Sequence, residues 1–114
     1  MNNQATLDRS FLALSHPVRR AIVGRLTAGP ASVGRASAGL GVSKPAVTKH
    51  LKVLERAGLL RRSVNGREHV LRIEPDALRE VSDWLELHRS LWERKFEVVD
   101  EFLADDDDEK EVPQ

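Results

Sequence analysis

The feature that most constrains this chain is a short glycine-containing turn between two expected helices. Ser32 is a suitable N-cap for a short first helix, and residues 39–42, with the sequence Gly-Leu-Gly-Val, have the composition of a tight turn. Ser43 can cap a second helix over residues 44–57, and Gly58 is a suitable stop for it. A short helix, a turn and a capped helix in this order are typical of a helix-turn-helix.

A basic hairpin is expected directly after this motif. Residues 59–64 and 67–73 flank Asn65–Gly66, a dipeptide preferred in two-residue type I′ turns because both positions need a positive φ. That turn predicts Leu60 opposite Leu71, as an apolar pair on the core face. A basic hairpin in this position is a wing. Its arginines are Arg61, Arg62, Arg67 and Arg72.

Apolar residues at helical spacing predict further helices on both sides of the motif. We expect one over residues 6–14, with Thr6 as its N-cap, and a second that starts at Pro17 and ends at the break over residues 28–30. A third follows residues 74–76, and its apolar spacing continues for about 25 residues over 78–103, roughly 40 Å of helix. So small a domain cannot cover that length, and the simplest partner is a second copy of the chain. The expected fold is mainly α with a small β-hairpin: a winged helix-turn-helix with long N- and C-terminal dimerisation helices.

Composition places the chain among soluble globular proteins. Its 114 residues fit one domain, 40% of them are hydrophobic and 32% are charged. No apolar run approaches the roughly 20 residues that span a bilayer, and the first residues do not resemble a signal peptide. Because the chain has no cysteine, disulfides and thiolate metal sites are excluded. We expect a cytoplasmic protein without contact with a membrane, although secretion without disulfides stays open.

The zero net charge hides a division along the chain. Residues 1–73 hold 13 Lys and Arg against 3 Asp and Glu, a net charge of +10, whereas residues 74–114 hold 5 against 15, a net charge of −10. A strongly basic part is typical of a protein that binds a polyanion. Two solvated faces that attract each other would give the same count, so the arrangement of the charges has to decide.

The predicted helix over 44–57 has an inward and an outward face. At 100° per residue, Leu51 and Leu54 fall within about 40° of Val47, so these three are expected in the core. The outward side carries three lysines and a threonine, which suit a helix in a DNA major groove: ammonium groups reach phosphates or guanine edges, and threonine offers a hydroxyl and a methyl. An ordinary surface helix with solubilising lysines is the plainer interpretation, but the turn before it and the wing after it favour DNA binding. The candidate DNA-binding residues are Ser43, Lys44, Pro45, Thr48, Lys49, His50, Lys52, Arg61, Arg62 and Arg67.

Among these candidates, His50 lies at the boundary between the two faces. A histidine there is more often a hydrogen-bonded packing residue than a base reader, and a phosphate contact is the other open role.

Three segments resemble the ArsR-type winged helix-turn-helix repressors: residues 13–22 (ALSHPVRRAI), 40–54 (LGVSKPAVTKHLKVL) and 57–59 (AGL). Trp84-Leu85 and residues 91–94 resemble the last helix of the metal-independent branch. The resemblance covers roughly residues 10–103. It implies a homodimer, joined through the first and last helices, that binds a short inverted repeat in double-stranded DNA and represses transcription, often of its own operon. The expected dimerisation residues are Leu7, Phe11, Leu85, His88, Trp92, Phe96 and Val99.

The chain departs from the metal-sensing members of that family. Their Cys-x-Cys matches Ser32 and Gly34 here, which cannot supply thiolates. Other members bind zinc with Asp and His on the last helix, whereas Asp83 is followed two residues later by Leu85. The four histidines are widely scattered, and no catalytic constellation is present. We therefore expect neither a metal, nor a cofactor, nor an enzyme. A metal or small-molecule sensor of the same fold is the main alternative, and a protein-interaction module, disfavoured by the basic residues, is another.

The chain ends in an acidic segment with four aspartates in succession. We expect one domain over residues 1–104 and an acidic, disordered tail over 105–114, because a block of like charges cannot bury itself. The tail either keeps the protein in solution or competes with DNA for the basic face. Removal of the residues after Ala104 raises the affinity for non-specific DNA only in the second case.

Overall fold

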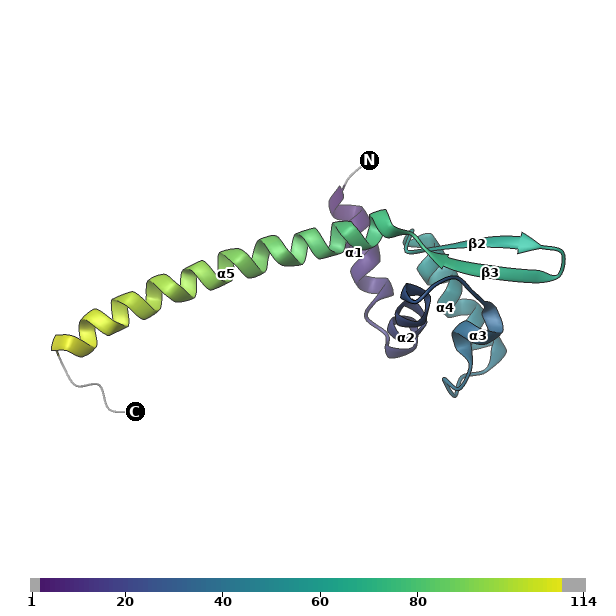
Figure 1. Cartoon of the computed structure of the whole chain (residues 1–114), viewed down its shortest axis with the longest axis horizontal. Coiled ribbons are helices and arrows are strands. Elements are labelled where there is room, and N and C mark those ends of the chain that lie inside the picture. Colours follow the sequence, from purple (N-terminus) through teal and green to yellow (C-terminus); the bar gives the residue numbers. More distant parts are fainter. Residues whose placement is uncertain (1–2, 110–114) are drawn as a thin grey trace. The chain divides into compact units, whose positions relative to one another are not determined.

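The computed structural model describes the backbone of residues 3–109 and the side chains of residues 4–104. The described residues form five helices and three strands. Figure 1 labels the helices and the two strands of the hairpin. The chain divides into two compact units, one ending at Val81 and one beginning at Ser82, and each is described by itself. In order, the elements are α1 (Asn3–Ala13), α2 (Pro17–Thr27), β1 (Ala31–Ser32), α3 (Val33–Ser37), α4 (Lys44–Arg56), β2 (Leu60–Asn65), β3 (Glu68–Ile73) and α5 (Pro75–Glu109).

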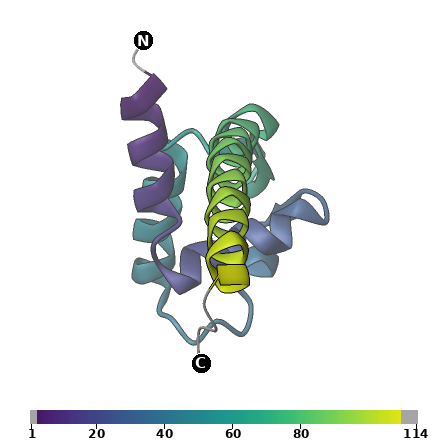
Figure 2. The ribbon, with the colours of Figure 1, turned by 90° about the vertical axis from the view of Figure 1, so that its left-hand side faces the viewer.

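The core of the first unit is apolar and draws on both helices and strands. Ile22 of α2, Leu54 of α4 and Leu71 of β3 are fully buried, and Leu51 is 2% exposed. Helix α1 packs alongside α4, and α2 contacts α3, α4 and β3 (Figure 2). The expected fold class is therefore confirmed: a mainly helical protein with a small antiparallel sheet.

The sheet has a third strand that the sequence does not reveal. Strand β3 lies in the centre, with β2 on one side and β1 on the other, and both pairs are antiparallel. In β1, Ala31 pairs with Leu71 and Ser32 with Val70. A two-residue strand has too few positions to show an alternating pattern, which is why only the hairpin was expected.

The hairpin turns one residue later than predicted. Asn65 remains in the strand and pairs with Glu68, so Gly66 and Arg67 form the two-residue loop. Gly66 has a φ of +65°, and within residues 3–109 no residue other than glycine has a positive φ. These signs fit a type II′ turn, with glycine in the first loop position, rather than the expected type I′.

The shifted turn changes the pairing of the core leucines. The predicted pair of Leu60 and Leu71 is wrong, since Leu60 lies opposite Ile73 and Leu71 lies opposite Arg62. Both leucines still face the core, at 3% and 0% exposure, because a register shift of two residues keeps every side chain on its own face.

The first and last helices are longer than expected. Helix α1 starts at Asn3, three residues before the predicted N-cap Thr6. The backbone of α5 is helical to Glu109, five residues into the segment for which a disordered tail was expected, because each added residue extends an existing hydrogen-bond ladder. Residues 110–114 lie outside the described residues. Within the described chain, none of the helices has the length and apolar character required to cross a membrane.

Candidate nucleic-acid interface

Helix α4 carries the predicted DNA-binding face, and its N-terminus is capped as expected. The Ser43 hydroxyl oxygen accepts a hydrogen bond from the backbone N–H of Ala46 at 3.2 Å, and Pro45 stands in the first turn. At the other end, Gly58 has a φ of +76°, which stops the helix and returns the chain to β2. Both ends are therefore set by local sequence.

The two faces of α4 lie as the helical geometry predicts. Val47, Leu51 and Leu54 are buried, at 6%, 2% and 0% exposure. On the opposite face, three lysine side chains and the hydroxyl of Thr48 are exposed to solvent. The Thr48 hydroxyl donates to the carbonyl of Lys44 at 3.1 Å, so its oxygen can still accept a hydrogen bond from a base. The exposed residues of this helix and its cap are Ser43, Lys44, Pro45, Thr48, Lys49, Lys52 and, at its last position, Arg56.

His50, in contrast, is half-buried where α4 meets the N-terminus of α2. Nη1 of Arg19 donates to Nδ1 of His50 at 3.2 Å, and the rings of His16 and His50 lie 4.3 Å apart. Burial lowers the pKa of His50 below its usual value, and the positive potential of His16 and Arg19 lowers it further. His50 therefore has the hydrogen-bonded packing role that its boundary position suggested.

The partners of His50 also join α2 to the end of α1. His16 caps α2, since its Nδ1 accepts from the backbone N–H of Val18 at 3.1 Å. The guanidinium of Arg19 donates to the carbonyls of Ala13 at 2.6 Å and Leu12 at 3.1 Å. Arg19 thus connects the C-terminus of α1 to α4, a role that sequence reasoning missed because its partners lie on two other elements.

The wing arginines differ in direction. Arg67, in the loop, is exposed, and the side chain of Arg61 is 69% exposed beside Glu74, at 2.9 Å. Arg62 was expected to face DNA with them, but it lies on the other face of β2 and is only 24% exposed. Its guanidinium pairs with Glu55 of α4 at 2.8 Å. Alternation along a strand turns Arg62 toward the helix and Arg61 away from it.

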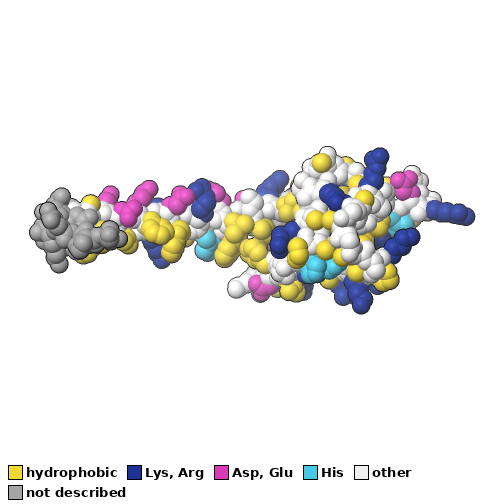
Figure 3. Space-filling model, turned by 90° about the horizontal axis from the view of Figure 1, so that it is seen from below, with side chains coloured by type: hydrophobic (Ala, Val, Ile, Leu, Met, Phe, Trp, Pro, Cys, Tyr) yellow, Lys and Arg dark blue, Asp and Glu magenta, His cyan; other side chains and the backbone are white. Residues whose placement is uncertain are grey.

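The expected dimerisation residues lie on α1 and α5. Leu7 and Phe11 are half-buried on α1, whereas the five on α5 are exposed in the single chain. Figure 3 shows hydrophobic side chains along one side of α5. Trp92 and Phe96 pack edge to face at 4.7 Å, and His88 stacks on Trp84 at 4.0 Å. His88 is therefore a surface residue of the protomer, available to an interface.

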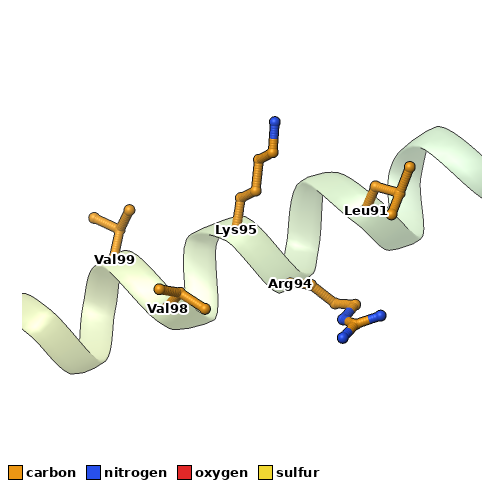
Figure 4. Close-up of a pocket in the computed structure, with 5 residues that line it drawn as sticks. All are labelled: Leu91, Arg94, Lys95, Val98 and Val99. Atoms are coloured by element: carbon orange, nitrogen blue, oxygen red, sulfur yellow. The ribbon is translucent and has the colours of Figure 1, made fainter.

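A shallow groove on the distal part of α5 extends this apolar side. It is lined by Leu91, Arg94, Lys95, Val98 and Val99, and Figure 4 shows these five side chains on successive turns. Val98, 65% exposed, was not among the residues expected at an interface, because it lies beside the line of regular spacing. The apolar surface is thus wider than a single helical stripe.

The positions of metal ligands in related sensors have other roles here. Ser32 caps α3 by accepting from the backbone N–H of Arg35 at 3.2 Å, and Gly34 has no side chain. Within the part of the chain that the structure describes, no three His, Asp or Glu side chains lie close enough together to hold a metal ion.

Comparison with known proteins identifies the family. A family model described as a helix-turn-helix domain matches residues 14–63. The HTH-type transcriptional regulator Rv2034 of Mycobacterium tuberculosis is 42% identical over 78 residues, which span 68% of this chain and 73% of that protein. The crystal structure of the ArsR family transcriptional regulator RHA00566 is 36% identical, with a TM-score of 0.71 over 77% of this chain and 97% of that one. The ArsR-like transcriptional regulator of Rhodococcus sp. RHA1 is 29% identical, with a TM-score of 0.70 over 87% and 93%.

A capped basic helix behind a glycine turn, followed by a β-hairpin, defines a winged helix-turn-helix DNA-binding protein. This chain belongs to the ArsR family of transcriptional regulators.

Proposed function

We propose that this protein is a homodimeric repressor that binds a short inverted repeat in double-stranded DNA. The observation that carries the proposal is the exposed face of α4, where three lysines surround Thr48 while the opposite face is buried. In a major groove, Thr48 meets base edges, and Lys44, Lys49 and Lys52 meet phosphates or guanine edges.

The wing supports the same proposal. Arg61 and Arg67 are exposed on β2 and on the loop, and they contact the sugar-phosphate backbone or the minor groove beside the α4 site. In a dimer, the two α4 helices enter successive major grooves about 34 Å apart, which gives the inverted repeat its spacing. Repression follows from the resemblance to the ArsR-type repressors. A promoter–reporter assay with and without the protein tests whether the protein lowers or raises transcription.

Thr48 and Arg67 are expected to contribute differently. The Thr48→Ala variant loses a base contact, so its preference for the cognate duplex over a scrambled one falls by about tenfold. The Arg67→Ala variant loses a phosphate contact, so it binds both duplexes more weakly and to a similar extent. Mobility-shift titrations of both variants on both duplexes measure this, and an equal loss of preference in the two would contradict the division of roles.

The affinity for DNA is expected to depend steeply on salt. About 6 to 8 phosphate contacts per dimer reduce the affinity about a thousandfold or more between 50 and 200 mM salt, because binding releases counterions from the DNA. Fluorescence anisotropy over this range gives the slope. An affinity that does not change with salt is incompatible with a lysine- and arginine-rich interface.

A further inference from the structure

Arg62 takes part in a three-residue contact that joins the wing to helix α4. Its Nη2 lies 2.8 Å from Oε1 of Glu55 and its Nε lies 3.4 Å from Oε2, so the guanidinium holds the carboxylate with two bonds. Its Nη1 donates to Nδ1 of His69 at 3.2 Å. The three side chains come from α4, β2 and β3, and we call them the wing clamp.

The clamp lies against the core rather than on the open surface. The side chains of Arg62 and Glu55 are 24% and 32% exposed. Arg62 lies opposite the fully buried Leu71, which places its aliphatic stem at the edge of the apolar core. A half-buried, two-bonded ion pair holds its geometry better than an exposed pair such as Arg61 with Glu74.

From this geometry we propose that the wing clamp sets the position of the wing relative to α4, and that Arg62 is a positioning residue and not a ligand of DNA phosphate. The inference rests on the proposed function, in which the wing contacts DNA. Three of the five N–H donors of Arg62 are already engaged within the protein. A phosphate would have to compete with Glu55 for Arg62, whereas Arg67 is exposed in the hairpin loop and Arg61 points away from the clamp.

The two possible roles of Arg62 predict opposite effects of Glu55→Gln. If Arg62 binds phosphate, this variant removes a competing carboxylate and a negative charge, so the affinity for DNA increases. If Arg62 positions the wing, the variant weakens the clamp, and the affinity falls by about fivefold even though a negative charge has been removed. Anisotropy titrations on the cognate duplex measure the direction of the change in affinity. An increased or an unchanged affinity overturns the proposal.

Three further variants separate the two roles of Arg62 when the change in affinity of Glu55→Gln is small. Arg62→Lys keeps the charge but cannot hold the carboxylate with two bonds, so it should bind as weakly as Arg62→Gln while its salt slope stays that of the wild type. The double variant Glu55→Gln/Arg62→Gln should bind no more weakly than either single one, because both disrupt the same contact. Wild-type affinity of Arg62→Lys, or additive losses in the double variant, contradict the clamp.

The matched control is Arg61→Gln, which changes an exposed arginine on the same strand. It should reduce the salt slope, and its effect should add to that of Glu55→Gln. Thermal unfolding of every variant by circular dichroism confirms that it is folded before binding is compared. If the wild type does not distinguish cognate from scrambled duplex, the proposed function fails; if it does and Glu55→Gln binds more tightly, only the clamp fails.

Discussion

His50 shows how one side chain on the proposed DNA-binding helix is engaged by contacts within the protein. It stands next to the exposed Lys49, but its Nδ1 accepts a hydrogen bond from Arg19 and its ring lies against that of His16. Since an arginine can only donate, this arrangement requires the neutral imidazole of His50. The same burial and the same two neighbours lower its pKa. Protonation of His50 thus opposes the native contact.

This linkage predicts a loss of stability in mild acid. The unfolded chain protonates His50 near its ordinary pKa of about 6.5, whereas the folded chain does so at a lower pH. Between these two values the unfolded state binds more protons, so stability falls as the pH falls through that window. Relative to His50→Gln, the wild type should lose free energy of unfolding as the pH falls from about 7.5 through the ordinary pKa of histidine. Chemical denaturation at several pH values measures the difference.

The control for this prediction is Lys49→Gln, which alters the neighbouring exposed residue and leaves the His50 contacts in place. It should follow the wild-type dependence on pH. A wild type and a His50→Gln variant whose stabilities run parallel over the whole range would refute the linkage.

At the scale of elements, the N-terminus of α4 is fixed by the hydroxyl of one residue. Ser43 caps α4 through the N–H of Ala46. The same side chain is exposed at the end of the helix that the proposed complex brings to DNA. A single residue therefore combines a structural role with a place in the proposed DNA interface.

Substitutions at Ser43 can separate these two roles. Ser43→Ala should lower the free energy of unfolding by about 1 kcal/mol, since the first turn of α4 loses its cap. Ser43→Asp keeps a capping oxygen and should unfold near the wild-type temperature, yet it should bind DNA more weakly because its carboxylate repels phosphate. Thermal melts and anisotropy on both variants make the comparison, and a Ser43→Asp variant with undiminished affinity would place this residue away from the DNA.

For the molecule as a whole, the second unit presents apolar surface that its own chain does not cover. Trp92, Phe96 and Val99 are 60%, 50% and 50% exposed on α5. Such a continuous patch is costly to leave in water, and a second copy of the chain can bury it in a symmetric contact. The proposed homodimer is the assembly that this surface favours.

Trp92→Ala should therefore weaken the dimer and, with it, the joint binding of two half-sites. We expect the dimer dissociation constant to rise by about tenfold or more, because a buried tryptophan contributes at least 2 kcal/mol to many interfaces. Sedimentation velocity over a range of concentrations measures it. Glu97→Ala changes an exposed residue that lies about 140° round the helix from Trp92 and about 100° from Val98, so it should leave the dimer intact. A monomeric wild type would remove the basis of the prediction.

The sequence by itself determined the elements that depend on neighbouring residues. The caps at Ser32 and Ser43 and the stop at Gly58 act within one turn of helix, and the buried face of α4 follows from a spacing of three to four residues. These signals are local, so they can be recognised without knowledge of the rest of the fold. The family resemblance rests on the same stretch of chain.

Only the tertiary structure decided where the half-buried polar side chains find their partners. Arg62 turns to Glu55, seven residues away, and Arg19 reaches His50, 31 residues away. The loop at Gly66 and the added strand β1 likewise depend on what β3 pairs with. A guanidinium or an imidazole has no preferred partner in the sequence. Packing brings one donor and one acceptor together, and their partial burial strengthens the hydrogen bond between them.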